Sequence, residues 1–281
     1  MGNITVGGTG KTPVVIALAR FLKEKGWRPG IVSRGYGGKI KHFPYQVHQN
    51  SNAREVGDEP LLIVRHTDCP SVIDPNRSRG VRALLKRAHC NLVISDDGLQ
   101  HSSLGRNIEI IVVDGERRFG NNFCLPAGPL REPTSRLNSV DFVISKENPL
   151  RHEFKLSLIP DHFYQLIQPK IKKTLDYFHG KTLHAVAGIG NPDQFFNSLR
   201  KLNLKIIEHP FPDHYLFKPH DFSYGSDAII IMTEKDAVKC VGFVDARLWC
   251  LNTKTELDTN LLNTVLKRVT TLNNNLKSSS G

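Results

Sequence analysis

The chain has 281 residues, 39% hydrophobic and 23% charged, a composition typical of a folded globular protein and not of a disordered chain. Lys and Arg number 38 against 27 Asp and Glu, and this net charge of +11 favours an anionic partner: nucleic acid, an acidic membrane surface or a phosphorylated substrate. The five cysteines form no C-x-x-C pair, which argues against a disulfide framework or a zinc site. The sequence contains no secretory signal and no membrane-spanning apolar run.

The start of the chain is glycine-rich. A short strand (residues 4–6) precedes a turn, and an apolar helix follows it (residues 13–25). The turn comprises Gly7, Gly8, Thr9, Gly10, Lys11 and Thr12. Glycines let successive backbone N–H groups point at one anion, and a helix N-terminus adds a positive dipole. Lys11 would contact the outer phosphates of a nucleotide and Thr12 would bind Mg²⁺. The alternative is a strand-to-helix turn without a ligand, since Thr5 stands where the strict pattern has glycine.

Two further polar features precede the middle of the chain. A strand over residues 30–33 leads into a flexible loop that carries Arg34 and Tyr36. Asp58 then comes just before an apolar helix over residues 61–65, where the helix dipole favours a carboxylate. At this point a catalytic role and a simple N-cap remain alternatives for Asp58.

An acidic pair follows the next buried strand. After a strand at residues 71–74 and a basic helix at 77–88, the strand 91–95 ends in Asp96 and Asp97. An acidic residue at the end of an apolar strand downstream of a phosphate loop commonly supplies the second Mg²⁺ contact. Adjacent carboxylates repel each other unless a cation or donors lie between them. We therefore predict a metal site, with a structural turn capped by Asp97 as the alternative.

The remaining pattern alternates strands and helices, which predicts a mostly parallel sheet covered on both faces. Further strands are expected at residues 108–114, 141–145, 182–186, 204–208, 228–232 and 248–251, and helices at 192–202 and 258–270. A proline-rich connection at 120–136 is long enough to be functional. Segments 154–159 and 163–168 are expected to form an antiparallel pair between two domains, and the tail from residue 273 to 281 to be disordered. Thr233-Glu-Lys-Asp236 has the wrong spacing for guanine selection.

Several motifs taken together resemble one family. They are Gly2-Asn-Ile-Thr-Val-Gly-Gly-Thr-Gly-Lys-Thr-Pro13, Ser33-Arg-Gly-Tyr-Gly-Gly38, Val56-Gly-Asp-Glu-Pro60, Asp96-Asp-Gly-Leu-Gln-His101, Leu125-Pro-Ala-Gly-Pro-Leu-Arg-Glu-Pro133, Gly188-Ile-Gly-Asn-Pro192 and Thr233-Glu-Lys-Asp-Ala-Val-Lys239. In this order they resemble the tetraacyldisaccharide 4'-kinase (lipid A 4'-kinase) family, up to about residue 255. That resemblance also accounts for Thr5, because the family's loop lacks the first glycine.

The resemblance implies a fold and a reaction. The expected fold is a P-loop NTPase-like α/β/α sandwich (residues 1–148), a second, smaller α/β domain that includes linker strands (149–257), and a C-terminal helix and tail (258–281). The expected reaction transfers the γ-phosphoryl group of ATP, with Mg²⁺, to the 4'-hydroxyl of tetraacyldisaccharide 1-phosphate. Partners would be that lipid and the anionic cytoplasmic face of the bacterial inner membrane, with peripheral attachment, no nucleic acid and a monomeric protein.

The resemblance also assigns roles to residues. Asp58, His214 and Lys11 would be catalytic, with Asp58 accepting the hydroxyl proton and His214 pairing with it across a cleft. The nucleotide would be held by Thr5, Val6, Gly7, Gly8, Thr9, Gly10, Lys11 and Thr12. The metal would be held by Thr12 with Asp96 or Asp97. Substrate or phosphate positioning would fall to Arg34, Tyr36, Arg77, Gln100 and His101.

Two departures from the family pattern leave alternatives open. Relatives carry an N-terminal extension with an amphipathic membrane-associating helix, whereas this sequence starts within the first strand. A truncated, misassigned or shortened N-terminus is therefore expected, and the protein would be soluble if that helix were its only anchor. Tyr215 stands where many relatives have a second histidine. The alternatives are an inactive nucleotide-binding remnant and another phosphate-loop kinase with a small-molecule acceptor.

Overall fold

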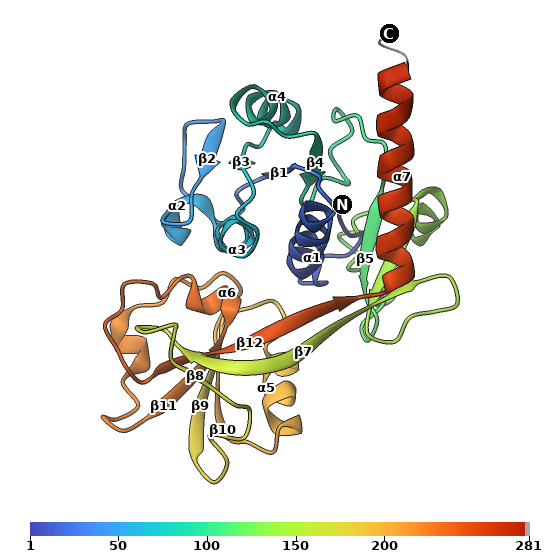
Figure 1. The fold of residues 1–281 in the computed structure, drawn as a ribbon. Helices are drawn as coiled ribbons and strands as arrows, with labels where there is room; N and C mark the ends of the chain where they lie inside the picture. Colours follow the sequence, from blue (N-terminus) through green and yellow to red (C-terminus); the bar gives the residue numbers. More distant parts are fainter. Residues whose placement is uncertain (279–281) are drawn as a thin grey trace.

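The computed structural model describes residues 1–278, and these form two lobes of mixed α/β structure (Figure 1). The first lobe contains α1 (Lys11–Glu24), β1 (Pro29–Ser33), β2 (Tyr45–Val47), α2 (Ala53–Val56), α3 (Asp58–Thr67), β3 (Ser71–Ile73), α4 (Arg77–Arg87), β4 (Leu92–Ser95), β5 (Ile110–Asp114), η1 (Thr134–Ser139) and β6 (Phe142–Lys146). The second contains β8 (Lys172–Lys173), β9 (Thr182–Ala187), α5 (Pro192–Lys201), β10 (Lys205–Pro210), η2 (Pro219–Phe222), β11 (Ile229–Thr233) and α6 (Glu234–Ala237).

Two long strands connect the lobes. They are β7 (Phe154–Gln165) and β12 (Leu248–Leu257), which pair in antiparallel fashion and run between the two lobes (Figure 1). The predicted break at Pro160 is wrong: β7 is one continuous strand, and its partner is β12 and not residues 163–168. Pro160 is accommodated close to a register shift between Asn252 and Thr253, because a bulge tolerates the missing N–H donor.

The sheets are mostly parallel, as the strand–helix alternation predicts. One has the order β2-β3-β1-β4, and the other has the order β10-β9-β11-β12-β7-β6-β5 with β8 beside β7. Only isolated bridges form at the predicted first strand, residues 4–6, and the two residues at the start of the chain lie between the two sheets. Met1 N donates to Ser95 O and Gly2 N donates to Ile110 O, at 2.9 and 3.0 Å. The glycine-rich turn therefore leaves from the junction of the sheets.

The C-terminal helix α7 (Thr259–Ser278) stands along the first lobe beside α1 and β5 (Figure 1). Leu261 and Val265 of α7 are buried in one cluster with Val14 and Leu18 of α1. The predicted disorder from residue 273 is wrong as far as Ser278, because the helix continues to that residue; the rest of the predicted tail, residues 279–281, lies outside the described residues. The apolar stripe thus ties the end of the chain to the helix that begins at the glycine-rich turn.

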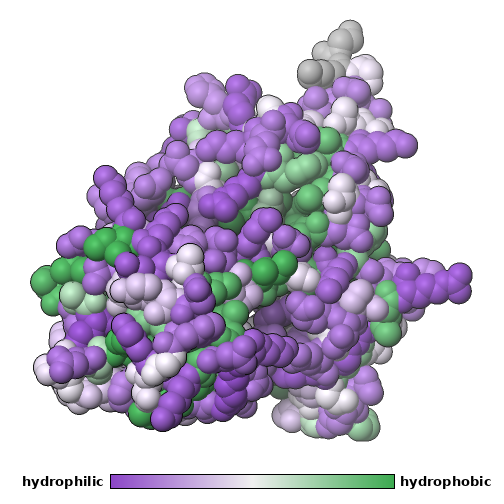
Figure 2. All heavy atoms as spheres, turned by 60° about the horizontal axis from the view of Figure 1, so that its bottom comes forward, coloured by the Kyte–Doolittle hydropathy of each residue, from purple (hydrophilic) through white to green (hydrophobic). Residues whose placement is uncertain are grey.

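One face of the molecule is mainly hydrophilic (Figure 2). With the bottom of Figure 1 turned forward, hydrophobic side chains appear in separate patches on a mostly hydrophilic face (Figure 2). Among the described helices, none is long and apolar enough to span a bilayer.

Candidate active site

The glycine-rich turn has the backbone of an anion-binding loop. Gly7 and Gly10 have φ angles of 90° and 92°, in the left-handed region that favours glycine. Helix α1 begins at Lys11, and no side chain caps its N-terminus. A Cβ atom on Gly8 would meet nothing within 4 Å. The first amides of α1 therefore remain available to an anion such as a phosphate.

Asn3 supports this loop through hydrogen bonds, and Thr9 is buried within the loop. Asn3 is fully buried; its Nδ2 donates to Thr5 O at 2.7 Å, and its Oδ1 accepts from Lys11 Nζ at 3.1 Å. Thr9 is also buried, and its hydroxyl has no hydrogen-bond partner among the described residues. Val6 is partly exposed, and its amide donates to Pro129 O at 2.9 Å. Asn3 thus orients the lysine that sequence reasoning singled out.

The two aspartates after β4 lie in different environments. Asp96 is 3% exposed, and its Oδ1 accepts no hydrogen bond from any described group. Burial, with the nearby Glu59, raises the pKa of Asp96 to about 7. Asp97 lies 3.4 Å from Lys11 Nζ and 3.2 Å from Arg131 Nη1. Burial alone raises the pKa of Asp97, but Lys11 and Arg131 outweigh it and hold the pKa below its ordinary value.

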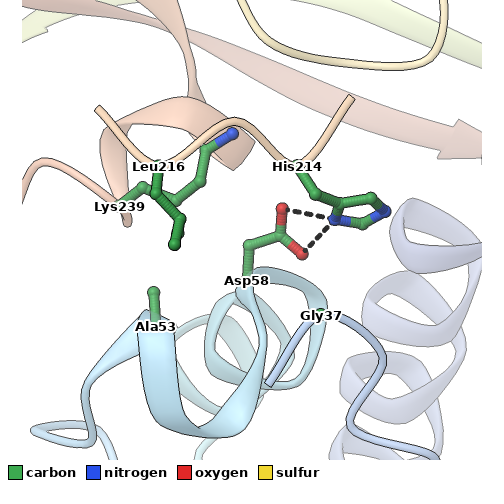
Figure 3. Close-up of a pocket in the computed structure, with 6 residues that line it drawn as sticks. All are labelled: Gly37, Ala53, Asp58, His214, Leu216 and Lys239. Atoms are coloured by element: carbon green, nitrogen blue, oxygen red, sulfur yellow. Dashed lines mark hydrogen bonds and ion pairs between the residues drawn. The ribbon is translucent and has the colours of Figure 1, made fainter. Parts of the chain in front are cut away.

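A carboxylate and an imidazole meet where the lobes face each other. Asp58 is the first residue of α3, and His214 lies on the loop after β10. His214 Nδ1 is 3.0 Å from Asp58 Oδ2 and 3.2 Å from Oδ1, and the two side chains point toward one another (Figure 3). Gly37, Ala53, Leu216 and Lys239 complete a small pocket around the pair. The predicted Asp58–His214 contact is present in the structure.

The electrostatics of this pair favour a charged contact. Burial raises the pKa of the Asp58 carboxyl, but the hydrogen bond from His214 and the charge of Lys235 outweigh it, so the pKa lies below its ordinary value. The hydrogen bond to Asp58 raises the pKa of His214. Asp58 is therefore ionised at neutral pH and keeps one side of the imidazole occupied.

The five residues expected to position substrate occupy different places. Arg34 and Tyr36 are exposed, and the Tyr36 ring lies 5.1 Å from the His214 ring, edge to face. Arg77 is buried, and its guanidinium donates to the carbonyls of Asp74 and Asp97, at 2.7 and 3.4 Å. Through these two hydrogen bonds, the buried Arg77 side chain positions the turn that contains Asp97.

The remaining two residues also make contacts within the protein. Gln100 Nε2 donates to Asn3 O at 2.9 Å and to Glu132 Oε1 at 2.7 Å. His101 Nε2 lies 3.3 Å from Arg77 N and 3.0 Å from Ser103 Oγ. Gln100 is thus beside the phosphate loop, whereas His101 lies at the start of α4.

Sequence reasoning missed several contributors. Arg131, from the proline-rich connection, contacts Asp97, and Arg117 donates to Gly8 O at 2.9 Å and to Asp114 at 3.0 Å. Lys235 lies 3.0 Å from Glu59 across the lobes. Arg131 and Lys235 belong to motifs that sequence reasoning quoted as wholes without weighing them singly. Arg117 stands in none of the quoted motifs, so only the fold brings it to the loop.

An α/β fold with a phosphate loop at α1, acidic residues after β4 and a carboxylate–imidazole pair close by defines a phosphate-loop enzyme of the kinase class. A family model described as tetraacyldisaccharide-1-P 4'-kinase, LpxK, matches residues 1–271. The chain therefore belongs to the tetraacyldisaccharide 4'-kinase family. This confirms the fold, family and enzyme class expected from the sequence.

Individual relatives agree with this assignment. The chain is 52% identical over 250 residues to a tetraacyldisaccharide 4'-kinase of Nitrosococcus oceani, covering 89% of this chain and 73% of the relative. It is 48% identical over 274 residues to that of Methylobacillus flagellatus, covering 97% and 82%. A crystal structure of LpxK from Aquifex aeolicus in complex with ATP superposes with a TM-score of 0.77 at 28% identity, covering 95% of this chain and 87% of that one.

Proposed function

We propose that this protein transfers the γ-phosphoryl group of ATP to the 4'-hydroxyl of tetraacyldisaccharide 1-phosphate. The names of its relatives and the ATP in the Aquifex aeolicus structure support this activity. The observation that carries the proposal is the Asp58–His214 contact, which joins a potential proton acceptor on the first lobe to a side chain on the second. The family match and the names of the relatives do not favour an inactive remnant or an unrelated acceptor.

The nucleotide would lie on the phosphate loop. Backbone amides of residues 7–12 would contact the phosphates, with Thr5 and Val6 at the loop's start. Lys11 would contact the outer phosphates, because Asn3 and Asp97 hold its ammonium group on this side of the loop. Arg117 adds a second cation beside Gly8. These groups would neutralise charge that develops during transfer.

The residues present fit a magnesium ion. The unpartnered, buried Oδ1 of Asp96 is the kind of oxygen that a hard cation binds, and Thr12, which is also buried, would add a hydroxyl. Asp97 already pairs with Arg131 and Lys11, so we assign the direct contact to Asp96. No cluster of three or more His, Cys, Asp or Glu side chains that could hold a metal occurs in the described part of the chain. That agrees with Mg²⁺, which commonly uses one or two carboxylates plus substrate phosphates; bound there, it would neutralise phosphate charge.

The acceptor hydroxyl would be activated at Asp58. As the bond from the 4'-oxygen to the γ-phosphorus forms, the bond from that phosphorus to the ADP oxygen breaks, and the hydroxyl proton passes to the Asp58–His214 pair. An ordinary aspartate is a weak base, with a pKa of about 3.9. His214 shares the proton: the hydrogen bond to Asp58 raises the pKa of His214, so its neutral imidazole takes up a proton more readily than the carboxylate does. Arg34 and Tyr36 would face the substrate, whereas Arg77, Gln100 and His101 would position the surrounding loops.

We also propose an attachment to the anionic cytoplasmic face of the inner membrane, as a peripheral monomer without a nucleic-acid partner. Phe123 and Leu125, 62% and 55% exposed, stand on the connection whose Pro129 and Leu130 contact the phosphate loop. Apolar side chains beside the site suit a substrate whose acyl chains lie in a bilayer. The net charge of +11 suits an anionic leaflet.

We propose residues 1–148 and 149–257 as the two units that close on the substrate, and 258–281 as a C-terminal segment whose helix α7 packs on the first unit.

A transfer assay tests the function. The protein is incubated with labelled ATP, Mg²⁺ and tetraacyldisaccharide 1-phosphate in detergent, beside Lys11→Ala and Asp58→Ala. We expect label in the lipid with the parent protein and at least a hundredfold lower rate with either variant. No transfer by the parent, with ATP still bound, would favour a nucleotide-binding protein. Full activity of Asp58→Ala would remove only the proposed base.

A further inference from the structure

The Thr233–Lys239 run is a sequence motif that the proposed reaction leaves without a role. The first lysine of this motif is Lys235, on α6 of the second lobe. The Lys235 side chain is 20% exposed; its Nζ lies 3.0 Å from Glu59 Oε1 of α3 and 3.5 Å from Asp213 Oδ1 of the loop after β10. One ammonium group therefore joins a carboxylate of each lobe.

Both carboxylates adjoin the proposed proton-accepting pair. Glu59 follows Asp58 in the chain, and Asp213 precedes His214. His214 Nε2 also lies 3.7 Å from Asp213 Oδ2. Three carboxylates and one imidazole thus converge where the lobes meet, and like charges so close together in a half-buried site repel each other strongly. Lys235 is the cation that offsets this repulsion directly.

The rest of the motif holds Lys235 in place. Asp236 is fully buried; its Oδ2 accepts from Gly188 N at 3.1 Å and from Thr233 Oγ1 at 2.7 Å. Lys239 Nζ is 2.6 Å from Asp236 Oδ1 and 5.1 Å from the centre of the Phe217 ring. These buried polar contacts fix the short helix to Gly188 and to the end of β11. The motif therefore holds Lys235 in the position where its ammonium group contacts Glu59 of the first lobe.

A second contact crosses the lobes from the same helix. Glu234 Oε1 lies 3.0 Å from His66 Nε2 at the last turn of α3. These two contacts attach α6 to both ends of α3, so the position of Asp58 at the start of α3 is tied to that of Lys235.

We propose that Lys235 is a positioning residue of the phosphoryl transfer, whose pairing with Glu59 and Asp213 holds His214 of the second lobe against Asp58 of the first. The proposal rests on the function proposed above. The charged groups that act on the pair are Asp213, which precedes His214 on the loop after β10, and Lys235 and Lys239, on and after α6. Glu59, on α3, follows Asp58 in the chain and pairs with Lys235. Removing Lys235 leaves the carboxylates facing His214 without their cation, and the imidazole then holds its proton more tightly.

The test compares Lys235→Met with Lys235→Arg, which keeps the charge, and with Lys254→Met, which removes an exposed lysine paired with Glu256 on β12. For Lys235→Met we expect at least a tenfold lower kcat, a KM for ATP within threefold of the parent value, and an acid limb of the kcat/KM profile at higher pH. Lys235→Arg regains most of the rate, and Lys254→Met matches the parent. Adding Asp213→Asn to Lys235→Met recovers part of the loss, since one unpaired carboxylate is removed.

A titration of His214 by NMR in substrate-free protein needs no turnover. We expect a higher pKa for His214 in Lys235→Met than in the parent. If the Met variant does not fold, the pKa of His214 is measured in Lys235→Gln, where we expect the same increase. An unchanged His214 titration with kcat within twofold would overturn the proposal, as would a tenfold rise in the KM for ATP at unchanged kcat. If the parent transfers no phosphoryl group, the proposed function fails, while the titration still decides whether Lys235 controls the pair.

Discussion

Gly190 of the second lobe lies directly against Gly8 of the phosphate loop. A Cβ atom on Gly190 would come 3.3 Å from Gly8 N and 3.1 Å from Asp213 Oδ2. Such distances are tighter than most side-chain contacts in proteins, so glycine allows the second lobe to approach the loop this closely. Gly8 N is one of the amides that a phosphate would contact. The second lobe therefore covers the nucleotide-binding loop as well as supplying His214.

Replacing Gly190 with valine should separate the lobes at this point. The branched side chain must displace either the Gly8 amide or the Asp213 carboxylate, and a misplacement of about 1 Å near the reacting groups lowers rates by about a hundredfold. We expect kcat/KM for ATP to fall by at least tenfold. Gly105→Val is the matched control, because a Cβ there meets nothing within 4 Å. Equal activity of the two variants in steady-state assays would contradict this close approach.

The sequence predicted most of the fold because its local signals agreed with its tertiary contacts. The helix predicted at 13–25 forms at Lys11–Glu24, and the apolar runs before Asp96 and Thr233 form β4 and β11. Pro160 was misleading, because proline usually ends a strand, yet here the long pairing of β7 with β12 and a bulge accommodate it. Asn273 lies within α7 because its helix packs on α1 along its apolar stripe, which a polar composition does not reveal.

The site was predictable only in part. Resemblance, not pattern, led to His214, whose partner Asp58 is 156 residues away in the chain. Arg117 and Asn3 could not be predicted because their roles depend on hydrogen bonds to the loop, Arg117 to Gly8 O and Asn3 to Thr5 O and Lys11. The fold brings such partners together, and no fixed spacing in the sequence indicates the contact.

The Asp58–His214 pair should make stability depend on pH in both directions. The pKa of Asp58 is lowered, so its contribution is present above the unfolded value of about 3.9 and is lost as pH falls through the folded pKa. The pKa of His214 is raised, so its contribution is present below about 6.5 and is lost as pH rises through the folded pKa.

The pair should therefore contribute most between about pH 4 and 6.5, by about 1–2 kcal/mol. Urea unfolding of the parent and of His214→Gln, measured from pH 4 to 9, checks this window. The stability difference should be largest near pH 5 and shrink toward pH 9. A difference that grows with pH would contradict the assigned charges.

Asp96→Asn should stabilise the metal-free protein while abolishing activity. Burial and the nearby Glu59 raise the pKa of Asp96 to about 7, so ionisation of this buried carboxyl makes folding less favourable as pH rises from about 4 to 7. Asparagine removes that charge. In EDTA at pH 8 we expect a Tm a few degrees above that of the parent, and no difference in Tm at pH 4.

Added Mg²⁺ and ATP supply the control for Asp96→Asn. They should raise the Tm of the parent by binding to the folded state, and raise that of Asp96→Asn much less. Calorimetry in matched buffers measures both effects. A variant less stable than the parent in EDTA at pH 8 would mean that Asp96 is satisfied by the protein itself, which contradicts its role as a metal contact.

Phe123 and Leu125 should matter only when the substrate is presented in a membrane. Both side chains are more than half exposed, so replacing them with serine should leave the fold and the Tm nearly unchanged. Burying two such side chains in a bilayer contributes about 3–6 kcal/mol at most, so the double variant should bind anionic phosphatidylglycerol vesicles at least tenfold more weakly and show a higher KM for substrate in those vesicles. Activity on substrate dispersed in detergent should stay within about twofold. Val244→Ser, at an 87% exposed position of the second lobe, is the control for this double variant. Equal vesicle binding by the double variant and the parent in a sedimentation assay would show that the bilayer contacts another part of the protein.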